Sequence, residues 1–177
     1  MPHDIHPELK QAVSRIPKMA FRRRSLWLTR PLLRLLDRSR PVSGVTVTEH
    51  RDGGARVRVH RPEALPQPTA GLLWIHGGGY IIGAPDQDDA VCSRLARDLG
   101  IVVAAAHYRL APRHPFPAAL DDCAAAWRWL QQHVGTDRLA IGGMSAGGGL
   151  AATLAQRLCD EGGPQPAAQL LLYPMLD

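Results

Sequence analysis

A serine between two glycines is the strongest chemical signal in the sequence. Residues 143–147 read Gly-Met-Ser-Ala-Gly, which fits the G-x-S-x-G pattern, between a predicted strand and a predicted helix. In that context the chain turns sharply at Ser145, and the serine hydroxyl projects from the end of the strand. The helix expected to begin at Ala146 points its positive dipole end at the same place, which favours a developing oxyanion. The alternative interpretation is a glycine-rich turn or a phosphate loop.

A run of three glycines is the second signal. His76-Gly77-Gly78-Gly79 directly follows a short apolar stretch that ends at Ile75. Consecutive glycines can turn backbone N–H groups toward a cavity, and hydrolysis of an ester needs such donors where the carbonyl oxygen becomes negative. A flexible loop is the alternative, but a position upstream of the serine turn favours an oxyanion loop. We expect His76 to be a structural hydrogen-bonding residue at the base of this loop and not the catalytic base.

A proline-rich stretch and a pair of acids complete the candidate residues. Residues 108–119 read Tyr-Arg-Leu-Ala-Pro-Arg-His-Pro-Phe-Pro-Ala-Ala, and prolines at this density fix the conformation of a loop. Asp121 and Asp122 could form a paired-carboxylate acid/base site. At the start of a predicted helix, however, we expect them to stabilise the helix dipole instead.

Alternating strand and helix patterns must position these residues. Apolar strands without polar alternation indicate a mostly parallel, doubly wound α/β sheet with helices on both faces. A leading hairpin that turns at residues 51–54, Arg-Asp-Gly-Gly, makes the sheet mixed at one edge. The expected strands cover 45–50, 55–60, 72–75, 101–106, 139–142 and 169–172, and the expected helices of this part cover 90–99, 118–133 and 146–159.

The N-terminal segment differs from the rest in pattern. Residues 5–40 are expected to be helical, interrupted by Pro17, and seven arginines lie between Arg22 and Arg40. A leucine stripe is formed by Leu26, Leu32, Leu33 and Leu36. We expect an accessory helix that docks on the main domain by its leucine face. A basic surface that touches membranes or acidic partners is the alternative. The chain is therefore divided into a helical segment over 1–42 and a core over 43–177.

Composition indicates one folded domain. The chain has 177 residues, of which 45% are hydrophobic and 21% charged, so a disordered protein is excluded. The net charge is +9 up to Arg61 and −4 after it, which argues against a nucleic-acid binder. No apolar run is long enough to span a membrane, and the start lacks the features of a signal peptide. Three widely spaced cysteines without a CxxC pair argue against a disulfide scaffold or metal site, and favour a cytoplasmic location.

Together the three motifs resemble one enzyme family. HGGG at 76–79, YRLAPRHPFPAA at 108–119 and GMSAGG at 143–148, in this order, resemble the hormone-sensitive-lipase-like esterases of the α/β-hydrolase fold. The resemblance runs from about Val45 to Pro174. It implies small-molecule carboxylic esters as substrates and no cofactor. It also implies that the helical segment over 1–42 is part of the family's cap, which closes over the acyl pocket.

The resemblance also assigns residues to roles. It implies that Ser145 is the nucleophile and that Gly77, Gly78 and the N–H of Ala146 form the oxyanion hole, with Gly79 as an alternative to Gly77. The sequence departs from the family where acids are usual, because it has His107, Arg113 and Met144 at those positions.

The order of the catalytic triad is a more serious departure. In this fold the serine precedes the acid and the histidine, yet all eight histidines of this sequence precede Ser145. We therefore expect the chain to correspond to the front of an esterase, without the last strands, the triad acid and the histidine, and to hydrolyse esters poorly by itself. The strand over 169–172 would then form an open sheet edge through which copies associate. A catalytically silent, ligand-binding relative of the same fold is the alternative.

Overall fold

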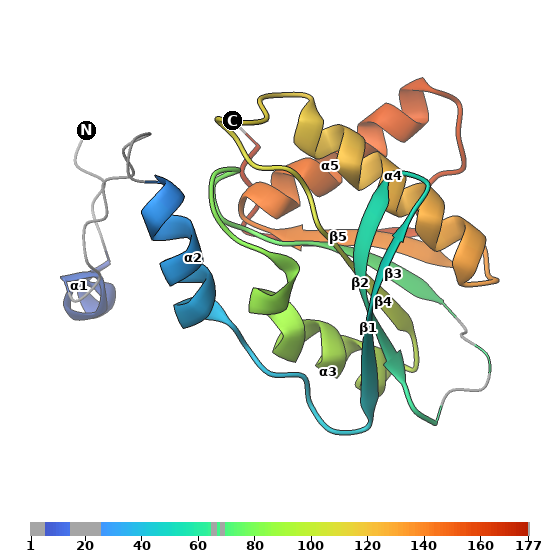
Figure 1. Ribbon diagram of the computed structural model, residues 1–177, viewed down its shortest axis with the longest axis horizontal. Coiled ribbons are helices and arrows are strands. Elements are labelled where there is room, and N and C mark those ends of the chain that lie inside the picture. The colour runs from blue at the N-terminus through green and yellow to red at the C-terminus, as the bar shows by residue number, and fades with distance from the viewer. Residues whose placement is uncertain (1–5, 15–25, 65–66, 68–69, 177) are drawn as a thin grey trace.

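A six-stranded mixed sheet forms the centre of the protein (Figure 1). The structure is a computed structural model, and it describes residues 6–14, 26–64, 67 and 70–176. The strands lie in the order β1-β2-β4-β3-β5-β6, in which β1, β2 and β4 pair antiparallel and β4, β3, β5 and β6 pair parallel. The strands are β1 (Val45–Asp52), β2 (Ala55–Pro62), β3 (Gly71–Ile75), β4 (Val102–Ala106), β5 (Leu139–Met144) and β6 (Ala168–Leu172).

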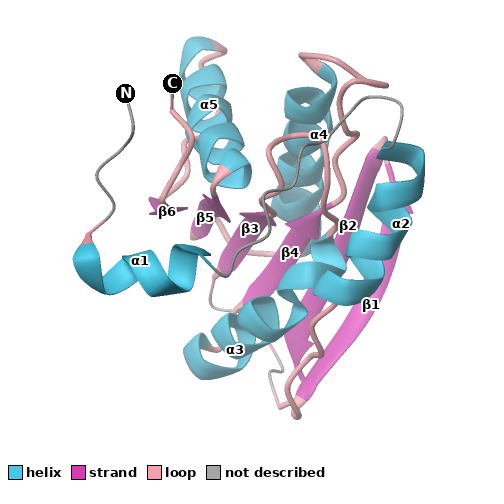
Figure 2. Ribbon diagram, turned by 90° about the vertical axis from the view of Figure 1, so that its left-hand side faces the viewer, coloured by secondary structure: helices cyan, strands magenta, loops and turns pink. Residues whose placement is uncertain are grey.

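Helices cover both faces of this sheet (Figure 2). Helices α4 and α5 pack on one face and α3 on the other, each over its own apolar cluster. The helices are α1 (Pro7–Ser14), α2 (Leu26–Asp37), the 3-10 helix η1 (Pro85–Asp88), α3 (Asp89–Leu99), α4 (Ala118–His133) and α5 (Ala146–Asp160). The predicted doubly wound sheet with a leading hairpin is confirmed, and the core elements lie within two residues of their expected bounds.

The central strands are apolar along their whole length because both of their faces are covered. Every residue of β3 and β4 is buried, and Trp74 and Ile75 of β3 are fully enclosed. The indole N–H of Trp74 donates to Asp88 Oδ2 at 2.8 Å, which ties β3 to η1. A buried polar group of this kind needs such a partner, since its desolvation is otherwise uncompensated.

The strand order brings two loops together at one edge of the sheet. The parallel neighbours β3 and β5 are in register from Gly71 opposite Leu139 to Ile75 opposite Gly143. The carboxyl ends of adjacent parallel strands meet at the same edge, which is where ligands bind in this class of fold. The chain leaves β3 into residues 76–83, which we call the glycine loop, and leaves β5 into the turn at Ser145.

The leucine stripe predicted in the N-terminal segment is covered only in part. Leu26 is buried and Leu33 is half-buried, whereas Leu32 and Leu36 are 57% and 69% exposed. Arg30 and Arg34, which share a helix face with Leu26 and Leu33, supply the polar contacts to the core. The reason is that the core offers carbonyl oxygens and a buried carboxylate to this helix, and these groups need donors. The segment over 5–40 that was expected to be helical contains α1 and α2, and the interruption expected at Pro17 lies outside the described residues.

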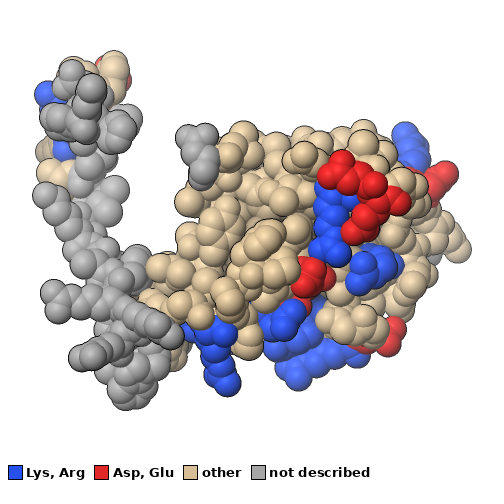
Figure 3. Space-filling model, turned by 90° about the horizontal axis from the view of Figure 1, so that it is seen from above, with Lys and Arg blue, Asp and Glu red and all other residues tan. Residues whose placement is uncertain are grey.

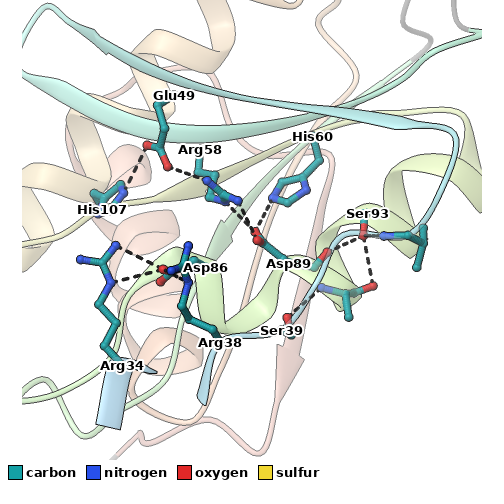
Figure 4. Close-up of polar contacts among 12 residues, drawn as sticks. Arg34, Arg38, Ser39, Glu49, Arg58, His60, Asp86, Asp89, Ser93 and His107 are labelled. Carbon is teal, nitrogen blue, oxygen red and sulfur yellow. Dashed lines mark hydrogen bonds and ion pairs between the residues drawn. The ribbon is translucent and has the colours of Figure 1, made fainter. Parts of the chain in front are cut away.

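A buried polar network joins the hairpin to α3 (Figure 4). Arg58 of β2 donates from Nε and Nη2 to the two carboxylate oxygens of Asp89, at 2.6 and 2.7 Å, and from Nη1 to Glu49 at 2.9 Å. These bonds raise the pKa of Arg58 above its usual value. His60 is fully buried with Nε2 at 3.5 Å from Asp89 Oδ1, and burial lowers the pKa of His60 to about 4. This imidazole is therefore neutral at pH 7.

Candidate active site

Ser145 is in a strained backbone conformation at the junction of β5 and α5. Its φ of 52° and ψ of −122° are unusual for a residue with a Cβ. Hydrogen bonds fix the turn on both sides: the Ser145 amide donates to Leu172 O, and its carbonyl accepts from the amides of Gly149 and Met175, all at 3.0 Å. The surrounding chain thus imposes the turn, as the serine pattern predicts.

The glycines on either side of the serine are required by close packing. A Cβ on Gly143 would lie 2.5 Å from the carbonyl oxygen of Ile75. A Cβ on Gly147 would lie 2.0 Å from the same oxygen and 2.4 Å from the carbonyl oxygen of His76. Neither distance is possible between real atoms, so only glycine allows the end of β3 to touch the first turn of α5. This contact brings the glycine loop to the serine.

Gly77 lies directly against the serine turn. A Cβ on Gly77 would be 3.5 Å from the Cβ of Ser145 and 3.2 Å from the carbonyl oxygen of Met144. Among the described residues, the amides of Gly77, Gly78 and Ala146 have no hydrogen-bond acceptor. The Ala146 amide belongs to the first turn of α5, whose N–H groups have no partner within the helix. Three unused donors therefore lie in the two segments that meet at Ser145.

The glycine loop has positive φ angles at three consecutive residues. Gly78, Gly79 and Tyr80 have φ values of 121°, 58° and 64°. Such values suit glycine and cost energy at a tyrosine, so neighbouring contacts must impose them. Within the loop, the amides of Ile81 and Ile82 both donate to Gly78 O, at 3.1 and 3.0 Å. Sequence reasoning missed the strain at Tyr80, which no local pattern signals.

His76 occupies a structural position at the base of the loop. Its side chain is 1% exposed, Nδ1–H donates to Gly77 O at 2.7 Å, and its ring stacks on Tyr108 with 4.2 Å between centroids. The Tyr108 hydroxyl donates to His76 O at 2.9 Å. Burial lowers the pKa of His76 to about 4. This histidine is therefore neutral at pH 7 and anchors the loop.

The two adjacent acids at the start of α4 are not a catalytic pair. Asp122 accepts from the amide and Nε of Arg109, at 2.7 and 2.8 Å, whereas Asp121 accepts from Arg157 Nη1 at 2.7 Å. Each carboxylate thus has its own arginine, and paired-carboxylate chemistry is excluded for them. Our expectation that they serve only the helix dipole missed these ion pairs, because Arg157 lies on another helix.

Other histidines have partners away from the serine. His107, at the end of β4, has Nε2 at 3.3 Å from Glu49 Oε2, and β3 separates its strand from β5. Burial lowers the pKa of His107. His133 bonds to Trp129 O at 2.8 Å, and no hydrogen bond joins a histidine side chain to Ser145 within the described part of the chain. The described residues also contain no cluster of three or more His, Cys, Asp or Glu that could bind a metal ion.

An apolar cavity adjoins the glycine loop. Its volume is about 360 Å³, and it is lined by Tyr80, Ala111, His114, Phe116, Leu120 and Leu150, among others. These residues come from the loop, the proline-rich stretch and two helices. A larger cavity of about 440 Å³, which includes Trp127 and Asp137, lies at the opposite, amino end of β5 and is remote from the serine. Of the two, the smaller cavity is the one beside the glycine loop, and Ser145 is not among its lining residues.

These features agree with the comparison to known protein families. Residues 72–177 match the model of a family described as the alpha/beta hydrolase fold. The chain belongs to this family.

Particular relatives place it near the hormone-sensitive-lipase-like esterases, as the motifs indicated. The chain is 43% identical over 129 residues to Esterase LipI of Mycobacterium tuberculosis, covering 69% of this chain and 40% of that protein. Its structure is similar to that of "Bacterial Heroin Esterase", with a TM-score of 0.84, 37% identity, and coverage of 98% of this chain and 59% of the other. A hormone-sensitive lipase from a metagenome library gives a TM-score of 0.80 and 33% identity, and the match covers 94% of this chain and 55% of the lipase. The chain thus spans 40% to 59% of the length of these relatives.

Proposed function

We propose that the protein hydrolyses carboxylic esters, with Ser145 as the nucleophile and the amides of Gly77, Gly78 and Ala146 as the oxyanion hole. The observation that carries this proposal is the meeting of the strained serine turn with the glycine loop. The Cβ position of Gly77 is 3.5 Å from that of Ser145, and three amides without acceptors lie around it. Such donors are what the tetrahedral intermediate of acyl transfer requires.

The proposed reaction proceeds through an acyl-enzyme. The hydroxyl oxygen of Ser145 attacks the ester carbonyl carbon while a base accepts its proton, and the carbonyl oxygen becomes negative between the three amides. Collapse of the intermediate expels the alcohol, which takes up a proton, and water then releases the acid. No described residue is placed as the base. We propose that the histidine and its acid come from the region that the longer relatives possess beyond the matched part.

We propose a small ester with an apolar acyl or alcohol group as the substrate. The names of the relatives, which are esterases and a lipase, support an ester. The cavity beside Tyr80 has no lysine, arginine, aspartate or glutamate among its lining residues. Seen from the side of α4 and α5, a broad surface lacks charged side chains, which gather toward one side (Figure 3). An uncharged group is therefore favoured near the serine.

Hydrolysis of a short-chain nitrophenyl ester tests this proposal. We expect residues 1–177 alone to turn over more slowly than about 1 s⁻¹, because serine is a weak nucleophile without a base. A chimera of this chain with the remaining part of Esterase LipI should hydrolyse the ester. In that chimera Ser145→Ala should lose a factor on the order of 10⁶ in kcat, whereas Ser43→Ala, at an exposed serine, should lose none. Equal rates in Ser145→Ala and the unmodified chimera would overturn the assignment.

We further propose that residues 1–42 act as a cap segment.

We also propose that copies of the chain associate through β6. Strand β6 is an edge of the described sheet, and Leu170 on it is 39% exposed. Open backbone groups beside exposed leucines favour pairing with another chain. A concentration-independent monomer mass in light scattering would contradict the association.

We also propose a cytoplasmic location. Cys92, Cys123 and Cys159 are free thiols, which suits a reducing compartment. None of the described helices has the length and apolar character needed to cross a membrane. Fractionation of cells that express the protein would test this location.

A further inference from the structure

An arginine of α2 bonds the backbone of the glycine loop. The guanidinium of Arg30 donates from Nε to Ile81 O at 2.9 Å and from Nη2 to Ala111 O at 2.5 Å. Ile81 belongs to the glycine loop, and Ala111 belongs to the proline-rich stretch that follows β4. Arg30 is partly buried, so water competes less with these bonds than it would on an open surface.

The two bonds of Arg30 join the glycine loop and the proline-rich stretch at a place where their backbones already contact each other. The amide of Ala111 donates to Tyr80 O at 3.0 Å, so the two loops already meet next to the Arg30 contacts. Ile81, whose carbonyl accepts from Arg30, also donates its amide to Gly78 O at 3.1 Å. One peptide unit thus separates the carbonyl bound by Arg30 from the segment Gly78–Tyr80. Tyr80 in that segment has a strained φ of 64°, which its surroundings must impose.

A second contact of the same helix lies further along the chain. Arg34 Nη2 and Arg38 Nε each lie 3.2 Å from Oδ2 of Asp86, whose side chain is 5% exposed, and the amide of Ser39 donates to Asp86 O (Figure 4). Arg30 and Arg34 are four residues apart and so share one face of α2. Arg34 and Arg38 can therefore anchor α2 on η1 when Arg30 is changed, which makes the role of Arg30 separable.

We propose that Arg30 is a positioning residue for the oxyanion hole. Its planar fork binds two carbonyls at once, fixes Ile81 and Ala111 relative to each other, and so fixes the direction of the Gly78 amide. Arg30 itself touches neither Ser145 nor the three amides. The inference rests on the proposed function for its effect on rate, but the effect on the loop is independent of catalysis.

Hydrogen exchange measured by mass spectrometry tests the effect on the loop in the 177-residue chain. Arg30→Met keeps the aliphatic stem and removes both donors. We expect exchange of the hydrogen-bonded amides of Ile81, Ile82 and Ala111 to become about tenfold faster, since local opening there becomes easier. Arg40→Met, at an exposed arginine, should leave these amides unchanged. Unchanged exchange in Arg30→Met, or equal acceleration in Arg40→Met, would overturn the proposal.

Kinetics in the chimera with the remaining part of Esterase LipI test the effect on the reaction. Loss of one oxyanion donor costs about 10²–10³ in kcat, so a displaced donor should cost roughly 10- to 100-fold, with little change in KM. Arg30→Lys should recover only part of the rate, because an ammonium group lacks the fork that spans two carbonyls. A full recovery by lysine, or a loss confined to KM, would contradict the inference.

The two proposals fail differently. Hydrolysis that survives Ser145→Ala removes the proposed function but leaves the exchange comparison intact. Unchanged exchange in Arg30→Met removes the positioning role while Ser145 can remain essential. If Arg30→Met unfolds the chain, the comparison is made with Arg30→Lys, whose loop amides should still exchange faster than those of Arg40→Met.

Discussion

The serine site and the contact between α2 and the core lie next to each other, yet different kinds of residue build them. Glycines and backbone groups build the site: the Cβ positions of Gly143 and Gly147 fall within 2.5 Å of the Ile75 carbonyl oxygen. Long charged side chains build the contact, in which Arg30 reaches backbone carbonyls and Arg34 reaches Asp86. The serine site requires residues without a Cβ atom, whereas the α2 contact requires acceptor groups on the core that the arginines can bind.

This difference predicts how each region responds to substitution. A steric requirement at a glycine is absolute, because backbone atoms of neighbouring elements occupy the space. An arginine contact at the surface is graded, since water competes for the donors and the side chain can adjust. Substitutions of Gly143 and Gly147 should therefore have large effects on stability, and those of the arginines at the α2 contact should have smaller ones.

Gly147→Ala should have the largest effect. Its Cβ would lie 2.0 Å from Ile75 O, so α5 must move away from β3, and we expect a loss of about 3 kcal/mol or more in the free energy of unfolding. Urea unfolding measures this loss. Gly163→Ala is the matched control, because its Cβ would be 3.6 Å from the nearest atom, Leu158 O. A loss in Gly147→Ala no greater than in the control would show that the close packing is not required.

Acid should weaken the serine site and also the network between the hairpin and α3, because each contains a buried neutral histidine. The pKa of His60 in the hairpin network and of His76 in the glycine loop is about 4, against the ordinary histidine value of 6.5. Between these values the unfolded chain binds more protons, so the stabilisation present above pH 6.5 is lost as the pH falls toward 4. Each histidine should cost about 2 kcal/mol between pH 7 and pH 5.

Urea unfolding of His60→Gln at the two pH values isolates the share of the hairpin network. The variant should lose about 2 kcal/mol less than the wild type between pH 7 and pH 5. An identical pH dependence in both proteins would mean that His60 is charged, or exposed, in the folded state.

Removal of both arginines that face Asp86 should have a moderate effect. Arg34→Met with Arg38→Met leaves a buried carboxylate without its cations, but these arginines are 55% and 59% exposed, so we expect a loss of about 1–2 kcal/mol. Adding Asp86→Asn should restore part of it, since the uncompensated charge is then gone. Calorimetric unfolding of the arginine double variant, of Asp86→Asn alone and of the two combined measures the coupling. Strictly additive losses would contradict the pairing.

Ser145→Gly should have the smallest effect and the opposite sign. Glycine adopts a φ of 52° without strain, and relief of that strain outweighs the greater freedom of glycine in the unfolded chain by about 1 kcal/mol. Ser145→Ala keeps the strain and should show no gain. Thermal unfolding compares the two, and equal stabilities would argue that the serine turn is relaxed.

The same contrast explains which features the sequence could predict. The alternation of apolar segments and the two glycine patterns are each visible in a short stretch of sequence, so the fold, the hairpin and the two loops could be predicted. The packing against the end of β3 that requires Gly143 and Gly147 could not. The contacts of Arg30 and the pairing of Asp121 with Arg157 depend on residues brought together only by folding. Leucine periodicity in α2 predicted an apolar docking face, and Leu26 of that stripe is buried while Leu32 and Leu36 are exposed. The periodicity could not predict that Arg34 pairs with Asp86.

Covalent labelling by a nitrophenyl phosphonate is the most direct test of the central claim, which is that Ser145 is a nucleophile beside an oxyanion hole. The phosphonyl oxygen occupies the oxyanion position, and the adduct remains on the attacking residue. In the chimera with the remaining part of Esterase LipI, peptide mass spectrometry should find a single adduct on the peptide that contains Ser145, and Ser145→Ala should abolish it. Ser43→Ala should leave the labelling unchanged. An adduct on another residue, or labelling that persists in Ser145→Ala, would contradict the account.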